Sequence, residues 1–219
     1  MLSNFETNIK EIKNKLMDIG NGLLESNKLI LEALNDCSVD NFNEAKAHIK
    51  NIAVKADSID NSIIKVLALY TPEAKDLRQV VAYMKTTNEL PRACSSTRSF
   101  IRGFTDVCED VDVETIKEYA LPMQASTVEA IKLTLSMINC EDNEEIQEIY
   151  NDVLIEENKT DDLYEMVERN LSIQADCANS FEKFHKMLRA LRKSGKISAR
   201  AISIANLLVY AKLGGNFHS

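Results

Sequence analysis

The chain has 219 residues and a formal net charge of −8, with six glycines, three prolines and no tryptophan. Nucleic acid needs a basic surface that neutralises its phosphates, so this acidic balance argues against nucleic acid as a partner. No window approaches the ~18 apolar residues of a membrane span, and the first residues lack a signal-peptide pattern. We therefore expect a cytoplasmic protein, long enough to bury one sizeable core or two smaller ones.

The cysteines are odd in number, widely spaced and include no C-x-x-C pair. Such usage is typical of reduced thiols in a cytosolic protein, and not of a disulfide framework or a zinc site. We expect these side chains to pack as small residues between helices. They are Cys37, Cys94, Cys108, Cys140 and Cys177.

The first helical signal is a run of apolar residues at alternating spacings of four and three over residues 5–37, interrupted at Ser26. This period predicts a long helix with a narrow apolar seam. Ser3 and Glu6 form a capping-box pattern in front of it. The same period recurs over residues 45–70 and predicts a second helix, antiparallel to the first because the loop between them is short.

A third helix is expected to begin at Thr71. This residue is a good N-cap, Pro72 suits the first helical position, and Glu73 complements the positive end of the helix dipole. The four-three period continues over residues 80–104. Pro91 lies inside this helix and removes one backbone hydrogen bond, which predicts a kink unless packing compensates.

The second half of the chain repeats this plan. Moving forward by 101 residues without a gap aligns Ile30 with Ile131 and keeps the helical phase, which indicates an internal duplication. We therefore expect an all-α protein of six long helices, arranged as two tandem antiparallel three-helix bundles. The first repeat spans residues 1–109 and the second spans 110–219, packed as one compact or elongated unit.

The fourth helix is expected over residues 113–139, with Pro122 as a second kink. The fifth helix begins near Asn143. It either continues to about Arg192 or breaks near Asp176, and the sequence leaves both alternatives open.

Positive charge gathers at the end of this fifth segment, where the basic residues include Lys186, Arg189 and Arg192. A basic amphipathic stretch can dock on an acidic partner or an anionic membrane. The alternative is a solvated face near a helix C-terminus, where basic residues are favoured by the helix dipole. The run K-S-G-K at residues 193–196 predicts the C-terminal end of the fifth helix, and the sixth helix is expected to begin at Ile197.

The pattern P-x-A-x-D-L-R at residues 72–78, followed by K-T-x-x-E-L-x-R at residues 85–92, resembles the PhoU family of phosphate-uptake regulators. The resemblance is sharpest over residues 53–95. It implies a regulatory adaptor without enzymatic activity, docking on a membrane phosphate transporter subunit or a sensor kinase at the inner face of the membrane, and it allows a homodimer. The alternative is a divergent helical-bundle interaction module with a different partner and no phosphate role.

In that family the second element usually continues as L-E-R-I-G-D, whose two acids help to hold surface metal clusters. Pro91 and Ser95 stand at the positions of these acids here. The resemblance leaves Glu157 and Asp161 as an E-x-x-x-D pair and Asp60 as a single acid in the first repeat. Iron or zinc centres need four to six donors, so we expect no cofactor and no multinuclear cluster. A weak divalent cation between Glu157 and Asp161 stays open, as does the alternative that Glu157 bends outward or meets a Lys or Arg across the bundle.

Asp76 and Arg78 form the polar part of the first motif. They are candidates for a signalling surface. The structural alternative is that Asp76 complements the start of the third helix and that Arg78 pairs with Asp60. The sequence shows no glycine-rich phosphate cradle, no nucleophile with a histidine partner and no catalytic carboxylate dyad, so we expect no catalytic residues.

Overall fold

The computed structural model describes residues 2–108, 113–174 and 178–214, which contain helices and no strand. The elements of the first half are α1 (Leu2–Asp36), α2 (Val39–His48), α3 (Ile52–Tyr70) and α4 (Ala74–Thr105). Those of the second half are α5 (Val113–Thr115), the π-helical turn η2 (Ile116–Ala120), α6 (Leu121–Asn139), α7 (Asn143–Gln174) and α8 (Ala178–Leu213). The predicted all-α plan of six long helical segments is confirmed, although two of the six are divided into shorter pieces.

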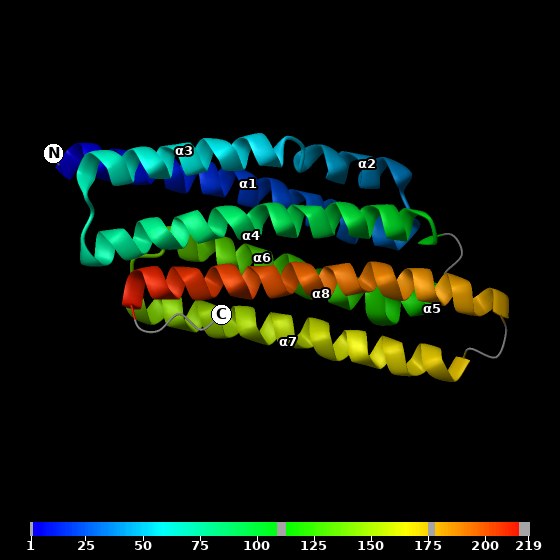
Figure 1. The fold of residues 1–219 in the computed structure, drawn as a ribbon. Helices are drawn as coiled ribbons and strands as arrows, with labels where there is room; N and C mark the ends of the chain where they lie inside the picture. Colours follow the sequence, from blue (N-terminus) through cyan, green and yellow to red (C-terminus); the bar gives the residue numbers. More distant parts are fainter. Residues whose placement is uncertain (1, 109–112, 175–177, 215–219) are drawn as a thin grey trace.

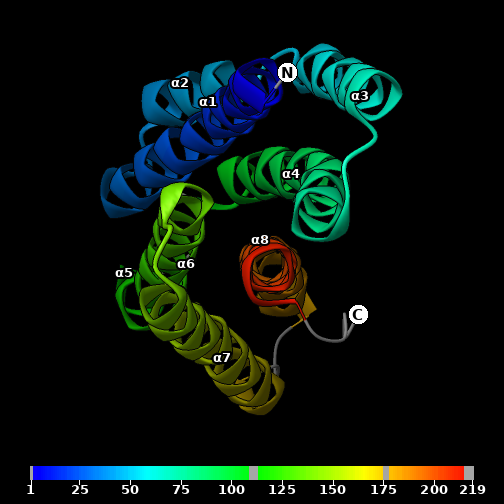
Figure 2. The same ribbon diagram turned by 90° about the vertical axis from the view of Figure 1, so that its left-hand side faces the viewer.

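The helices lie side by side along one long axis (Figure 1). In the end view, α1, α2 and α3 lie on one side, α7 on the other, and α4, α6 and α8 between them (Figure 2). The most extensive contact between two helices joins α4 to α8. Another contact, which is less extensive, joins α1 to α6. Both contacts run between the two predicted repeats, whose boundary at residue 109 stays a prediction.

The predicted second helix is divided into α2 and α3 by a turn at Asn51, which has a left-handed backbone with φ 56°. The guanidinium of Arg98 in α4 donates to the Ile49 carbonyl at 2.8 Å and satisfies a group that the break frees. Close approach also shapes this turn, because a Cβ at Gly22 of α1 would lie only 2.6 Å from the His48 carbonyl oxygen. The break is therefore set by contacts from other helices, which the local period does not contain.

Two predicted helix starts are wrong. Thr71 adopts a left-handed backbone and ends α3, so it does not cap α4, which begins at Ala74 with Glu73 as its N-cap. Ser3 lies inside α1, which already begins one residue earlier. Pro91 is accommodated within α4, which runs on without a break.

The fourth predicted helix contains a π-helical turn where a simple kink was expected. Pro122 has no backbone N–H, so it cannot donate to the carbonyl four residues earlier. The N–H of Leu121 instead donates to the Ile116 carbonyl, five residues back. The wider π-helical turn accommodates the backbone hydrogen bond that Pro122 cannot make, and α6 begins directly after it.

Helices α7 and α8 are separate, so the fifth helix does not continue to Arg192; the expected break near Asp176 lies outside the described residues. The predicted stop at residues 193–196 is wrong, because α8 passes through it. A glycine inside a helix costs about 1 kcal/mol relative to alanine. Here Gly195 packs against α7, since a Cβ on it would lie 3.7 Å from Asp161 Oδ1.

Two large hydrophobic clusters follow one another along the long axis of the bundle. One contains Leu16 of α1 and Tyr83 of α4. The other contains Phe42 of α2 with Phe100 and Phe104 of α4, whose rings stack at a centroid distance of 5.3 Å. Burying a side chain of this size contributes about 1.5–3 kcal/mol, so both clusters stabilise the fold.

A buried layer of polar residues lies between the two clusters. It draws on α1, α4, α6, α7 and α8, and each of its side chains is at most 2% exposed. On α1, α4, α6 and α7 the polar residues lie in sequence between the residues of one cluster and those of the other; on α8 Ser194 does the same, while Ser198 directly follows Ile197 of the first cluster. We call this set the polar layer: Asn27, Thr97, Gln124, Thr127, Thr160, Ser194 and Ser198.

Hydrogen bonds within the polar layer satisfy its members. The Gln124 amide donates to Asn27 Oδ1 at 3.0 Å, and its carbonyl accepts from Ser194 Oγ at 2.7 Å. Thr127 Oγ1 lies 3.3 Å from Ser194 Oγ and 3.1 Å from Ser198 Oγ. Buried polar groups are costly when unpaired, so this closed network favours one register of the helices.

Two cysteines depart from the expectation of reduced thiols. Cys37, directly after α1, and Cys108, shortly after α4, form a disulfide with their Cα atoms 5.7 Å apart. The prediction missed this pair because residues 71 positions apart come together only once α1 and α4 pack. Cys94 is a buried free thiol whose pKa burial raises to about 12, and Cys140 is a half-buried free thiol. Cys177 lies outside the described residues.

A helix that crosses a bilayer needs about 20 consecutive, predominantly apolar residues. Among the described helices, none has a stretch long and apolar enough to cross a membrane.

Candidate functional site

Glu157 and Asp161 lie one turn apart on α7. Burial, followed by the charge of Asp161, raises the pKa of Glu157. Burial, followed by the charges of Asp162 and Glu165, raises the pKa of Asp161. No Lys or Arg among the described residues forms an ion pair with either acid, so the alternative that Glu157 meets a basic side chain across the bundle is not found among them.

Asp60, the third acid predicted as a metal ligand, is not brought to the same place. It lies on α3 with its Oδ1 buried and without a hydrogen-bond partner. Burial, and then the charge of Asp57, raises its pKa. The described residues contain no group of three or more His, Cys, Asp or Glu that could hold a metal ion. A weak cation between Glu157 and Asp161 stays a prediction.

Asp76 and Arg78 lie near the start of α4. Asp76 is exposed in the first turn, where an acid complements the helix dipole. The predicted ion pair of Arg78 with Asp60 is wrong, because Arg78 Nε and Asp60 Oδ1 are both buried without a hydrogen-bond partner among the described residues. Arg78 lies instead against the C-terminal end of α8: its Nε is buried without a partner among the described residues, and a Cβ at Gly214 would lie 3.5 Å from its Cζ.

The basic residues of α8 point in more than one direction. Arg192 lies towards α7, where burial raises the pKa of Tyr164 and the Arg192 charge opposes that rise. Lys186 and Arg189 lie on a different face and line a cleft against α4. The three residues predicted to form one docking face are therefore divided between two helix neighbours.

The cleft between α4 and α8 has a volume of about 330 Å³. Four of its lining residues are basic and one is acidic. We call it the basic cleft, and its lining residues are Ser99, Arg102, Gly103 and Asp106 on α4 with Lys186, Arg189, Ala190 and Lys193 on α8.

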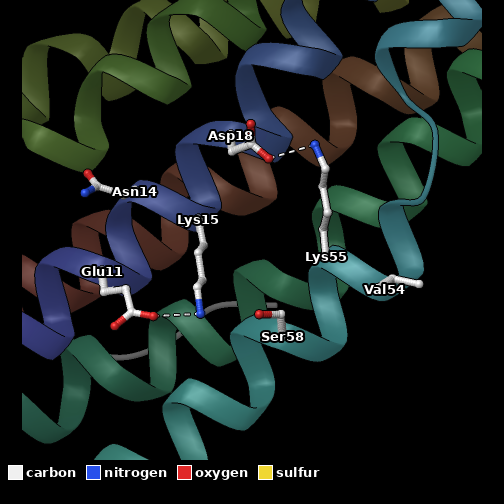
Figure 3. A pocket seen from close by; sticks show the side chains of 7 residues that line it. All are labelled: Glu11, Asn14, Lys15, Asp18, Val54, Lys55 and Ser58. Atoms are coloured by element: carbon white, nitrogen blue, oxygen red, sulfur yellow. Dashed lines mark ion pairs between the residues drawn. The ribbon is translucent and has the colours of Figure 1, made fainter.

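A second hollow of about 400 Å³ lies between α1 and α3. We call it the α1–α3 groove; it is lined by Glu11, Asn14, Lys15, Asp18, Val54, Lys55 and Ser58 (Figure 3). Lys15 pairs with Glu11 at 2.8 Å, and Lys55 reaches across from α3 to Asp18 at 2.7 Å. Its charges therefore neutralise one another.

Sequence reasoning did not select Arg102, and it placed Lys193 in a helix stop that the structure does not have. Arg102 lies more than 80 residues before the basic segment of α8, so no local signal links it to that segment. The available signal is positional: both helices contribute residues at i, i+3, i+4 and i+7, which places each set on one helical face.

Comparison with known proteins is informative only at the level of structure. No protein-family profile matches the chain, and no curated protein matches it. The crystal structure of PhoU from Pseudomonas aeruginosa matches with a TM-score of 0.84 and 18% identity, covering 96% of this chain and 100% of that one. The phosphate transport system regulatory protein PhoU from Streptococcus pneumoniae matches with a TM-score of 0.79 and 16% identity, covering 98% and 99%. This chain therefore has the fold of the PhoU proteins, as the resemblance in its sequence predicts.

Proposed function

We propose that this protein is a non-enzymatic regulatory adaptor of phosphate uptake and signalling. The observation that carries the proposal is the match to the PhoU structure from Pseudomonas aeruginosa, which extends over 96% of the chain. The similar protein from Streptococcus pneumoniae is described as a regulator of a phosphate transport system. The P-x-A-x-D-L-R motif at the start of α4 adds independent support from the sequence.

An adaptor of this kind acts by docking helical surfaces on a membrane phosphate transporter subunit or a sensor kinase, at the inner face of the membrane. Asp76 and Arg78 offer one candidate surface, where α4 begins beside the end of α8. The exposed side chains of Lys186 and Arg189 offer a second, basic one, and Arg192 adds an exposed charge on the neighbouring face of the same helix. Exposed charges of this type accelerate association with an acidic partner and select against basic ones.

A divergent interaction module with a different partner is the competing function. The observation that favours it is the loss of two acids on α4, where Pro91 and Ser95 stand at the positions of the family's ligands. A protein that kept the bundle and lost these acids retains surfaces for binding, and its partner is then not constrained by the fold.

The two functions are separated by affinity purification of the protein from phosphate-replete and phosphate-starved cells. The adaptor proposal expects recovery of a phosphate transporter subunit or a sensor kinase, reduced when Lys186, Arg189 and Arg192 are reversed to Glu. The matched control reverses three exposed lysines elsewhere: Lys10, Lys50 and Lys117. Recovery of unrelated partners only would favour the competing function.

A further inference from the structure

We propose that the basic cleft binds a small polyanion that carries a chain of two or three phosphate groups. This inference does not rest on the proposed function, because binding to a small anion is a property of the purified chain. It rests on the charges, the spacing and the size of the cleft between α4 and α8.

The first argument is electrostatic. Arg102 on α4 faces the same cleft as Arg189 and Lys193 on α8, so like charges converge from opposite helices. Among the described residues, no carboxylate forms an ion pair with any of these three, although Asp106 lies at the same cleft. Juxtaposed like charges are unfavourable, and a concave site focuses their field on an anion.

The contact between α4 and α8 is charge-matched at another point along the two helices. Arg200 of α8 donates to Glu89 of α4 at 2.8 Å, and Arg92 pairs with the same carboxylate at 3.1 Å. Glu89 is largely buried, with 15% of its side chain exposed. In the cleft the single acid, Asp106, forms no ion pair with a basic residue among the described residues, so an external anion would complete the pattern.

The helix dipole does not explain the basic residues of α8. Cations are favoured in the last turn of a helix, and this effect is lost beyond that turn. Lys186 and Lys193 lie in the N-terminal half of α8, which ends only at Leu213. These residues therefore do not lie near a helix C-terminus, where the structural alternative from the sequence placed them.

The backbone geometry leaves room for a ligand between the long side chains. Gly103 and Ala190 occupy the same position, i+4, in the two matching sets, and a Cβ at Gly103 would lie 3.4 Å from the Ala190 Cβ. The helices approach closely at these small residues, where Ala190 is buried, whereas Arg102 and Arg189 are exposed. Lys186 pairs with Glu182 at 2.8 Å, but both side chains are about half exposed or more, so this pair is weak.

The chemical class of the ligand follows from these groups. Guanidinium forks match the oxygens of phosphate, and ammonium groups add charge without restricting orientation. The lining carries four positive charges and one negative charge, which suits an anion of several charges. A volume of about 330 Å³ is at the lower end of the ~300–1,000 Å³ typical of small-molecule sites, so a phosphate chain fits better than a large ligand.

The test is isothermal titration calorimetry of the full chain at about 150 mM salt, where weak surface attraction is screened. The probes are tripolyphosphate, pyrophosphate, ATP, ADP and orthophosphate. We expect saturable one-to-one binding of the phosphate chains, tighter than orthophosphate. Equal affinity for tripolyphosphate and ATP means that the phosphate chain alone is recognised, whereas tighter binding of ATP means that the nucleoside contributes; both results support the proposal.

Arg102→Glu and Arg189→Glu should each weaken binding about tenfold or more, because each removes a charge-assisted contact and adds repulsion. Arg189→Lys should retain part of the affinity. The matched control is Arg192→Glu, which reverses the same charge on the same helix outside the cleft and should change the affinity less than about twofold. These positions are exposed, and unchanged circular dichroism and Tm confirm that each variant folds.

Three outcomes overturn the proposal. In the first, the phosphate chains do not bind. In the second, Arg192→Glu weakens binding as much as Arg189→Glu, which marks a diffuse basic surface. In the third, the protein binds vesicles containing anionic phospholipid while free phosphate chains neither bind nor compete, which makes the face a membrane contact.

Discussion

The polar layer and the basic cleft are both polar regions at helix contacts, yet they differ in how their groups are satisfied. In the polar layer, buried amides and hydroxyls from five helices bond to one another. In the basic cleft, cationic side chains from two helices face a hollow, and three of them have no carboxylate partner among the described residues. A closed network fixes the helices relative to each other, whereas an open cluster of charge leaves interactions to be made with something else.

The contrast separates structural polarity from functional polarity within one bundle. The α1–α3 groove belongs with the closed type despite its larger volume, because Lys15 and Lys55 are both neutralised by acids (Figure 3). Hollow volume alone therefore does not identify a site. Unbalanced charge at a concave surface is the better criterion here.

The largest effect is expected where a covalent bond secures one end of the basic cleft. Cys108 follows Asp106 closely and is joined to Cys37 across 71 positions of sequence. Opening a loop of this size should lower the free energy of unfolding by about 4 kcal/mol. Urea denaturation of the Cys37→Ser, Cys108→Ser double variant measures it, and a midpoint equal to that of the oxidised wild type would contradict the disulfide.

The next effect concerns the closed network. Gln124→Ala removes the donor to Asn27 Oδ1 and the acceptor of the Ser194 hydroxyl in a buried position and should cost about 2–3 kcal/mol. The matched control is Asn88→Ala on α4, an exposed amide that bonds only within its own helix and should change stability by about 0.5 kcal/mol or less. Equal losses in both variants would remove the distinction between the polar layer and the surface.

A smaller effect distinguishes the two parts of the α4–α8 contact. Arg189→Gln should raise the free energy of unfolding by about 0.3–0.5 kcal/mol at low salt, since it relieves like-charge repulsion in the basic cleft. Arg200→Gln should lower it by about 0.5 kcal/mol, since it breaks the ion pair with Glu89. Thermal unfolding at low and high salt tests both. If the two variants shift Tm in the same direction, the cleft is not electrostatically unbalanced.

The smallest effect concerns the acids on α7. The pKa of Glu157 and of Asp161 is raised in the folded state, so their ionisation destabilises the fold at neutral pH, and this cost is removed as the pH falls through their folded pKa values. Asp161→Asn should raise Tm by about 1 °C at pH 7, the size expected for one like-charge pair one turn apart. The difference from wild type should vanish near pH 4. A difference that grows as the pH falls would contradict the sign.

The same pair offers a metal test. A divalent cation such as Ca²⁺ should raise the Tm of the wild type slightly and leave that of Asp161→Asn unchanged, because two carboxylates can hold a cation only weakly. Elemental analysis of protein prepared without chelator should find fewer than two transition-metal ions per chain. Two or more would overturn the prediction that the chain lacks a multinuclear cluster.

The periodic features of the sequence predicted the long elements well, because a four-three apolar period is a local property of each helix. Local signals failed where another element decides the outcome. Thr71 is a good N-cap by type, but the preceding helix uses it as a terminus. The K-S-G-K run has the composition of a stop, yet Ser194 is held in the polar layer and Gly195 packs on α7.

The candidate sites were less predictable for the same reason. Lys186 and Arg189 could be selected because they lie in a basic segment, but their neighbour across the cleft, Arg102, is distant in sequence. The disulfide of Cys37 with Cys108 depends on the packing of α1 and α4 in the same way. Contacts between distant segments become visible only when the helices are placed.

The central claim, that this PhoU-like fold regulates phosphate uptake, is tested most directly by measuring phosphate uptake in cells that lack the protein. Uptake is followed in replete and starved cultures of the deletion strain, with and without a plasmid copy of the wild-type chain. We expect deletion to change the rate of uptake or its response to starvation, and the wild-type copy to restore it. Unchanged uptake under both conditions would contradict the account.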